Sequence, residues 1–207
     1  MRVTGLFAAC LLIALAFTLA VPAPIAKQEE PPEKQPKSEK FGALAFLQSG
    51  AGRAMVGAGA RVNVDLYLKR YTTDAEAKSM AGALLEGGPD ALLKALEKAK
   101  SIGKITVTGR VGFYDLKIIR SHRTPEGRRI YAVGDRPMGF LEVYSGNPSR
   151  DYPFGILQID LKPNKKGREE GEGALLYAAK IKVLDGKSID VESYGIGPIK
   201  LMGVRKL

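Results

Sequence analysis

The chain contains one histidine, His122, and its position could suit a catalytic base. Arg120 and Arg123 flank it near the end of a predicted strand, and nearby positive charges favour the neutral imidazole, which accepts a proton. We favour the simpler interpretation of an exposed histidine on the rim of a hairpin, because unusual surroundings mark a functional site only some of the time. No Gly-x-Ser-x-Gly turn is present, so hydrolysis by a Ser–His pair is disfavoured.

Two carboxylates in predicted strands, Glu142 and Asp160, could form the acid and nucleophile of a glycoside hydrolase. Apolar residues stand on both sides of each carboxylate along the chain. Because successive side chains of a strand point to opposite faces, those apolar neighbours predict that Glu142 and Asp160 lie on the solvent face. No catalytic residue is therefore assigned.

Metal and thiol chemistry are also disfavoured. Cys10 is the only cysteine and lies in the predicted leader, so a chain cleaved after the leader has neither disulfides nor a thiol nucleophile. With one histidine left, an ordinary zinc site is not expected. We predict no metal and no cofactor.

The sequence carries 32 Lys and Arg against 22 Asp and Glu, a formal net charge of +10. The charges are dispersed and there is no tryptophan, so nucleic-acid binding is disfavoured. Anionic lipid headgroups or acidic polymers are the more natural partners of a basic envelope protein. The candidate ligand-binding or anion-binding residues are Arg120, His122, Arg123, Arg128 and Arg129 around one hairpin, Lys162, Lys165, Lys166 and Arg168 in one loop, and Arg136.

Arg136 belongs to a predicted turn, Asp135-Arg136-Pro137. The turn is explained by its aspartate and proline, so we favour an internal salt bridge over an anion site here. Most charged runs are simply solvated surface, and this is the alternative to a binding role for both basic patches.

A helical pair is expected between residues 73 and 102. Thr73-Asp74-Ala75-Glu76 has the spacing of a capping box, and apolar residues then recur at helical spacing through Leu85. Gly88-Pro89 predicts the end of one helix and the start of the next, whose stripe includes Leu92 and Leu96. We therefore expect a two-helix hairpin with one apolar face.

Strand patterns surround this helical segment. Residues 61–69 alternate apolar and polar side chains, and 41–60 predicts an edge strand or an irregular lead-in. The later segments with strand composition are 104–108, 112–121, 128–133, 139–144, 154–161, 174–184, 188–194 and 199–204. Asp185-Gly186 predicts a tight hairpin, and 162–173 an exposed loop. The fold class is α+β, mainly antiparallel β: a strongly curved meander sheet or barrel with the helical hairpin inserted after the first clear strand.

The N-terminal 40 residues precede this domain. Residues 1–20 have the charged start, apolar run and small-residue cleavage site of a secretory signal peptide, although a retained anchor is the alternative. Residues 21–40 are rich in Pro, Glu and Lys and predict a disordered tether. Residues 41–207 then form a single β-rich domain, with no transmembrane span in the mature protein. The expected location is periplasmic or extracellular.

The order of strand, helices and meander resembles helix-grip ligand binders, and the strand count resembles lipocalin-like barrels. Arg61-Val62-Asn63-Val64, Gly87-Gly88-Pro89-Asp90 and Asp135-Arg136-Pro137-Met138 are similar to segments of an uncharacterised family of exported bacterial proteins. That resemblance implies export and domain extent, and no activity.

Three functions follow from these expectations. The first is a non-catalytic envelope protein that binds a small apolar ligand or lipid inside the curved sheet. The alternative is a structural or interaction module that binds an anionic envelope partner through basic loops. A hydrolase-type enzyme ranks third.

Overall fold

Antiparallel strands dominate the computed structural model, which describes residues 38–46, 61–138, 151–184, 188–194 and 198–207. All of these residues belong to one compact unit, Gln35–Leu207. The elements in chain order are β1 Glu39–Phe46, β2 Arg61–Leu68, α1 Asp74–Lys98, β3 Gly103–Val107, β4 Tyr114–Leu116, β5 Ile118–Thr124, β6 Gly127–Gly134, β7 Phe154–Pro163, β8 Glu169–Leu184, β9 Ser188–Ser193 and β10 Ile199–Lys206.

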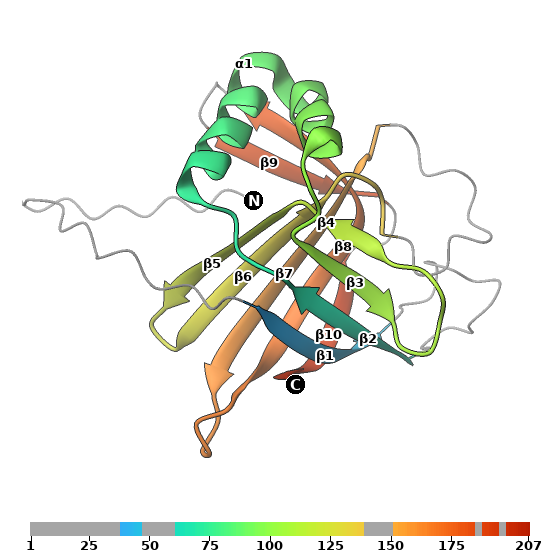
Figure 1. Cartoon of the computed structure of the whole chain (residues 1–207), viewed down its shortest axis with the longest axis vertical. Coiled ribbons are helices and arrows are strands. Elements are labelled where there is room, and N and C mark those ends of the chain that lie inside the picture. Colours follow the sequence, from blue (N-terminus) through green and yellow to red (C-terminus); the bar gives the residue numbers. More distant parts are fainter. Residues whose placement is uncertain (1–37, 47–60, 139–150, 185–187, 195–197) are drawn as a thin grey trace, which may run out of the picture. The chain divides into compact units, whose positions relative to one another are not determined.

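The strands form one sheet with the order β4-β3-β2-β1-β10-β8-β7-β6-β5, and β9 pairs with β8 beside this path (Figure 1). The two end strands, β4 and β5, are separated in the chain by Lys117 alone. The backbone N–H of Lys117 donates to the carbonyl of Val133 in β6, at 2.8 Å. The sheet is therefore nearly closed and barrel-like, which confirms the prediction of a mainly antiparallel, strongly curved sheet or barrel.

The concave face of this sheet is packed with apolar side chains. In β1 the alternate residues Phe41, Ala43 and Ala45 are buried, as the period of a strand requires. They join one buried cluster with residues of nearly every other strand: Val64, Leu66, Leu68, Ile105, Val107, Leu116, Ile119, Ile130, Ala132, Leu157, Ile159, Leu161, Leu175, Ile199, Leu201 and Val204. Residues of opposite strands thus fill the interior between them.

The helix α1 begins as the sequence predicts. The Thr73 hydroxyl accepts from the N–H of Glu76, and the Glu76 carboxylate accepts from the N–H of Thr73 at 2.9 Å, so the capping box is formed. Gly88, with a φ of 72°, and Pro89 kink the helix where a break was predicted. The structure nevertheless has a single helical element, Asp74–Lys98, which is interrupted at Gly88, and the predicted two-helix hairpin is not confirmed.

The apolar side of α1 packs on the convex face of the sheet. Leu84, Leu92 and Leu96 form a second buried cluster with Phe154 of β7 and with Ala179 and Ile181 of β8. Partly buried side chains of β5 to β8 surround it: Ile118, Val133, Ile156, Leu176 and Val183. These alternate with the residues that fill the interior, so α1 covers the opposite face of the same strands.

Several strands begin or end at other residues than the sequence predicts. Glu39 and Lys40, assigned to the tether, lie in β1, and β1 is not an edge strand because it pairs with both β2 and β10. The predicted strand 112–121 is divided by Lys117 into β4 and β5. The predicted leader, the predicted strand 139–144 and the turn residues Asp185 and Gly186 lie outside the described residues, although β8 and β9 do pair antiparallel.

The prediction of an exposed loop over residues 162–173 is wrong, because β7 continues to Pro163 and β8 begins at Glu169. Glycine explains the difference. A Cβ at Gly171 would lie 1.7 Å from the carbonyl oxygen of Asp160, so only glycine permits the two strands to approach this closely here. A glycine-rich, charged composition predicted a loop, and in the structure the same glycines allow a long hairpin.

Candidate functional site

A cluster of charged side chains lies inside the sheet at one end of the packed interior. Glu39 is the first residue of β1, Arg128 the second of β6, Glu169 the first of β8 and Lys206 the last of β10. Tyr71 follows β2 and is 5% exposed. Glu39 and Arg128 stand two residues before the inward-facing Phe41 and Ile130, so the strand period directs both inward. We call these five residues the Glu39 cluster.

The Glu39 carboxylate is the centre of this cluster, and its side chain is 1% exposed. Arg128 donates to both of its oxygens, at 3.0 and 2.8 Å, and the Lys206 ammonium donates to Oε1 at 2.7 Å. The Tyr71 hydroxyl donates to Oε2. Arg128 also donates from Nε and Nη2 to Glu169, both at 2.6 Å, so its guanidinium joins two carboxylates.

These contacts control the ionisation of the cluster. Burial alone would raise the pKa of Glu39, but hydrogen bonds from Arg128, Lys206 and Tyr71 outweigh burial and lower this pKa to about 2. Burial and the hydrogen bond to Glu39 raise the pKa of Tyr71. Burial would lower the pKa of Arg128, but the bonds to Glu39 and Glu169 raise it. Glu39 therefore stays ionised and Arg128 stays charged at neutral pH.

The arrangement binds strands together and leaves no group ready for chemistry. Two carboxylates face two cations, so the charges balance, and every side chain of the cluster is bonded to another member of it. A catalytic base needs an acceptor that faces a substrate, and the Glu39 oxygens already accept four donors. The cluster links β1, β6, β8 and β10 across the interior and closes that end of the sheet with polar contacts.

The lowered pKa of Glu39 predicts a specific dependence of stability on pH. Because its pKa falls from 4.5 to about 2 on folding, its contribution is complete above pH 4.5 and is lost as the pH falls through 2. We expect the difference in unfolding free energy between the wild type and Glu39→Gln to be on the order of 3 kcal/mol at pH 7 and to shrink towards pH 2. Urea unfolding across this range measures it.

Glu76 titrates over the same pH range, so its contribution must be separated from that of Glu39. Its pKa also falls to about 2, through the hydrogen bonds from Arg70 and Thr73, but it is a surface residue of the capping box. Both proteins in the comparison retain Glu76, so its titration cancels from the difference. Parallel curves for the wild type and Glu39→Gln from pH 7 to 2 would contradict the assignment.

The predicted basic hairpin does not form a free cationic patch. Arg120 pairs with Asp74 at 2.7 Å and donates to the Thr72 carbonyl. Arg129 pairs with Asp160 on the outer face, where Asp160 was expected. Arg128 points to the interior, and Arg123 has a further interaction of its own. Arg120, Arg128 and Arg129 thus pair with different carboxylates, and Arg128 and Arg129 lie on opposite faces of the sheet.

The second predicted patch is more open. Lys162 pairs with Glu126 across the neighbouring hairpin. Lys165, Lys166 and Arg168 are exposed in the turn between β7 and β8, where Asn164 Oδ1 accepts from the N–H groups of Lys166 and Arg168 at 2.8 and 2.9 Å. Within the described part of the chain, no carboxylate lies at ion-pair distance from these three cations.

His122 and Arg136 occupy separate places. His122 is exposed on β5, with its ring 5.8 Å from the Tyr131 ring. The favoured salt bridge inside the 135–137 turn is not the one in the structure, because Asp135 pairs with Lys117 at 3.3 Å. Arg136 instead donates to the Phe113 carbonyl at 2.9 Å and lies over the Tyr114 ring. Arg136 thus contacts Phe113 and Tyr114, and it does not pair with Asp135.

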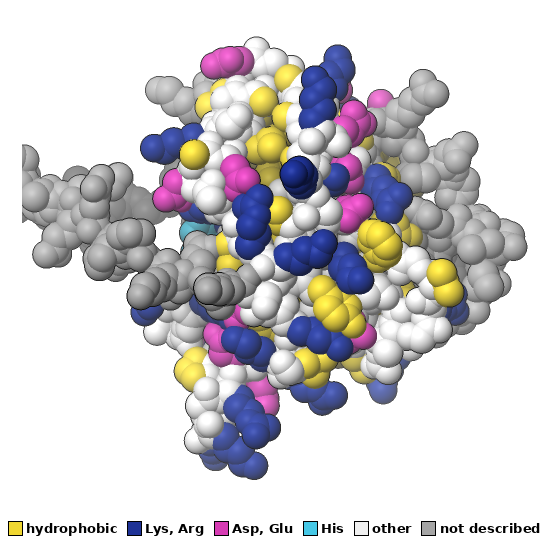
Figure 2. All heavy atoms as spheres, viewed as in Figure 1, with side chains coloured by type: hydrophobic (Ala, Val, Ile, Leu, Met, Phe, Trp, Pro, Cys, Tyr) yellow, Lys and Arg dark blue, Asp and Glu magenta, His cyan; other side chains and the backbone are white. Residues whose placement is uncertain are grey.

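A basic–aromatic face lies on the exterior of β1 to β4. The Lys40 and Lys104 ammonium groups lie 4.9 and 5.1 Å from the centre of the Tyr67 ring, on opposite neighbours of β2. Lys104 also lies 5.4 Å from the Phe113 ring. Figure 2 shows Lys and Arg side chains between exposed hydrophobic ones over these strands. We define the basic–aromatic face as Lys40, Tyr67, Lys104, Arg110, Phe113 and Arg136.

This face is not evident from the sequence, because its residues come together only through strand pairing. Lys40 pairs with Tyr67, and Tyr67 with Lys104, so three residues far apart in sequence form one row across the sheet. The alternation of 61–69 placed Tyr67 on the wet face, which was the available signal. The partners of Tyr67 required the register of β1 and β3.

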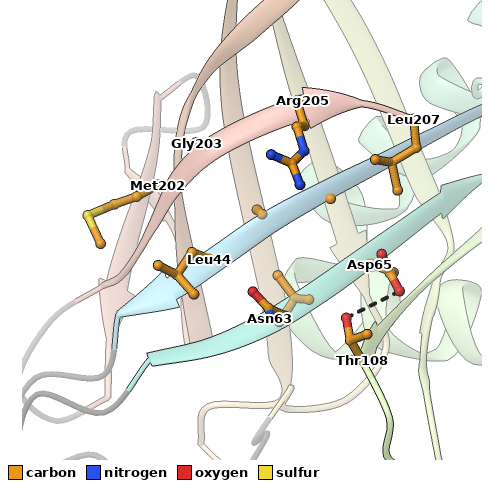
Figure 3. A pocket seen from close by; sticks show the side chains of 11 residues that line it. Leu44, Asn63, Asp65, Thr108, Met202, Gly203, Arg205 and Leu207 are labelled. Atoms are coloured by element: carbon orange, nitrogen blue, oxygen red, sulfur yellow. Dashed lines mark hydrogen bonds between the residues drawn. The ribbon is translucent and has the colours of Figure 1, made fainter.

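A shallow hollow of about 540 Å³ lies beside this face, on the exterior of β1, β2 and β10 (Figure 3). Leu44, Met202 and Leu207 line it together with Asn63, Asp65 and Arg205. The Thr108 hydroxyl donates to Asp65 at 3.3 Å at its edge. A bulge between Gly42 and Leu44 and the positive φ of Gly203 shape the strands around it.

Two further findings concern metal binding and membrane-spanning helices. Among the described residues, no three His, Cys, Asp or Glu side chains are placed to hold a metal ion. The same residues include no helix that is both long and apolar enough to cross a membrane. No protein-family model, curated protein or solved structure matches the chain, so we infer function from the geometry alone.

Proposed function

We propose that this protein is an exported, non-catalytic interaction module that binds an anionic component of the cell envelope through its basic–aromatic face. The observation that carries the proposal is the row Lys40–Tyr67–Lys104. Both ammonium groups are held over one aromatic ring, and neither forms an ion pair with a described carboxylate. Their charge is therefore available to a partner at the surface.

The contrast with the other cations supports this choice. Arg120, Arg128 and Arg129 are committed to carboxylates of the chain itself. An aromatic ring that holds a cation in place reduces the side-chain entropy lost when a partner binds. The exposed Lys165, Lys166 and Arg168 have no such support and form a second, looser basic site.

Binding of a small apolar ligand ranks second. The interior, where such a ligand was expected, holds fully buried Phe41, Leu66, Ile105 and Ile130 from different strands. The outer hollow would suit a ligand with polar groups, because Asn63, Asp65 and Arg205 line it. A hydrolase ranks last, since His122 is exposed and none of the described carboxylates is hydrogen-bonded to it. Export and a periplasmic or extracellular location belong to the proposal on the strength of the leader.

Charge reversal on the surface tests the proposal. We expect Lys40→Glu, Lys104→Glu and Arg110→Glu together to lower the affinity for a soluble acidic polysaccharide at least tenfold at low salt, because each cation near an anionic surface contributes roughly 1 kcal/mol. The three residues lie on one face, and none of them forms an ion pair with a described carboxylate, so their reversal breaks no such pair. Binding is measured by calorimetry at low and at physiological ionic strength, and it should weaken as salt screens the charges.

Lys94, Lys98 and Lys100, exposed in and just after α1, provide a matched control. Their reversal changes the net charge equally, and none of the three residues belongs to the basic–aromatic face. A second variant reverses Lys165, Lys166 and Arg168, and we expect a smaller loss than on the face itself. Equal losses in all three variants would indicate net charge alone, and affinity unchanged in the face variant would refute the proposal.

A further inference from the structure

An exposed apolar loop adjoins the basic–aromatic face. Thr108 to Phe113 connect β3 to β4, and within this loop Val111 is fully exposed and Phe113 is 50% exposed. Gly109 and Gly112 have φ values of 78° and 111°, which only glycine adopts without strain. The two glycines thus turn the backbone on either side of Arg110 and Val111 and present both side chains outward.

This exposure is unusual for the residue types concerned. A large apolar side chain without neighbours gains roughly 1.5–3 kcal/mol when it leaves water, so its position at a loop tip favours a partner that supplies an apolar medium. Val111 belongs to neither of the two buried apolar clusters that the described residues form.

Cations surround the loop. Arg110 stands next to Val111, Lys104 lies 5.4 Å from the Phe113 ring, and Arg136 is hydrogen-bonded to the Phe113 carbonyl. The carboxylates of β2, β3 and β4 are Asp115, opposite Lys104 in the register, and Asp65, which accepts from Thr108. The three cations Arg110, Lys104 and Arg136 outnumber these two carboxylates around the apolar tip.

From this combination we infer that the loop inserts into the surface of an anionic lipid bilayer. Val111 and Phe113 enter the boundary between headgroups and acyl chains, and Arg110, Lys104 and Arg136 contact the phosphates. Apolar insertion together with electrostatic attraction is the general requirement for stable binding at a membrane surface. The inference rests on the proposed function and specifies its partner, because an acidic polymer would use the cations but would not require Val111.

Vesicle binding tests this inference. The full chain is mixed with vesicles of equal parts phosphatidylglycerol and phosphatidylcholine, and with vesicles of phosphatidylcholine alone, and bound protein is measured by flotation. We expect binding to the anionic vesicles only. Val111→Ser with Phe113→Ser should lower the partition coefficient roughly tenfold or more. Both residues are exposed, so the variant should retain the wild-type unfolding midpoint. Leu85→Ser on α1, where Leu85 is 52% exposed, is the matched control and should bind like the wild type.

The outcomes separate the inference from the proposed function. Wild-type binding that is unaffected by Val111→Ser with Phe113→Ser overturns the inference, and so does the absence of binding to anionic vesicles. If vesicle binding is absent but the acidic polysaccharide still binds through Lys40, Lys104 and Arg110, the proposed function stands with a polymer as its partner. If neither vesicles nor polysaccharide bind, both fail.

Discussion

Arg128→Met is expected to lower the unfolding free energy by about 3–5 kcal/mol, since it leaves the buried Glu39 carboxylate without its main partner. Arg128 donates to Glu39 and to Glu169, and its side chain is only 15% exposed. Methionine preserves most of the apolar volume, so the loss reports on charge more than on packing. Chemical denaturation at pH 7 measures the change.

Two further variants make this result interpretable. Arg168→Met removes an exposed arginine without a recorded ion pair and should change stability by less than about 0.5 kcal/mol. Glu39→Gln combined with Arg128→Met should cost clearly less than the sum of the single changes, because each single change leaves the other charge uncompensated. Additive effects would show that the two side chains do not interact as the structure indicates.

Leu96→Ala should destabilise the protein by about 2–5 kcal/mol. Leu96 is fully buried and packs with Phe154 of β7 and with Ala179 and Ile181 of β8. Truncation leaves a cavity between α1 and the convex face of the sheet, and the kinked helix has few other buried anchors: Leu84 and Leu92. Thermal and urea unfolding measure the effect.

Leu85→Ala is the control for helix docking. Leu85 is predicted on the apolar stripe of the first helical segment, beside Leu84, but is 52% exposed, so its truncation should change stability by less than about 0.5 kcal/mol. Similar losses from Leu85→Ala and Leu96→Ala would mean that α1 does not use the face seen in the structure. A small loss from Leu96→Ala would mean that the helix contributes little to the core.

Local signals predicted the parts of the fold that depend on near neighbours. The capping box of Thr73 and Glu76 set the start of α1, and the alternation after Arg61 identified β2. The position of β1 could not be predicted in this way, because a Gly/Ala-rich strand becomes central only through pairing with β10, more than 150 residues later. The paired strand from Glu169 was missed for a related reason, since its glycines serve a close contact with β7.

The candidate site was predicted only in part for the same reason. Arg128 was named as a surface cation, and its alternation with the apolar Ile130 and Ala132 was the available sign that it points inward. Its partner Glu39 is 89 residues away and had been assigned to the tether. The row Lys40–Tyr67–Lys104 likewise exists only in the register of three strands. Sequence patterns indicate the face of a residue, and pairing between distant strands decides its neighbours.

The position of β10 between β1 and β8 has a consequence for how the protein folds. Until residues 199–206 are available, the growing sheet has two unpaired internal borders, and Glu39 lacks Lys206. Contacts between such distant segments carry a large loop-closure entropy and form slowly. Weakening the pairing of β10 with β1 or β8 is therefore expected to expose two strand borders, where unpaired N–H and C=O groups favour self-association.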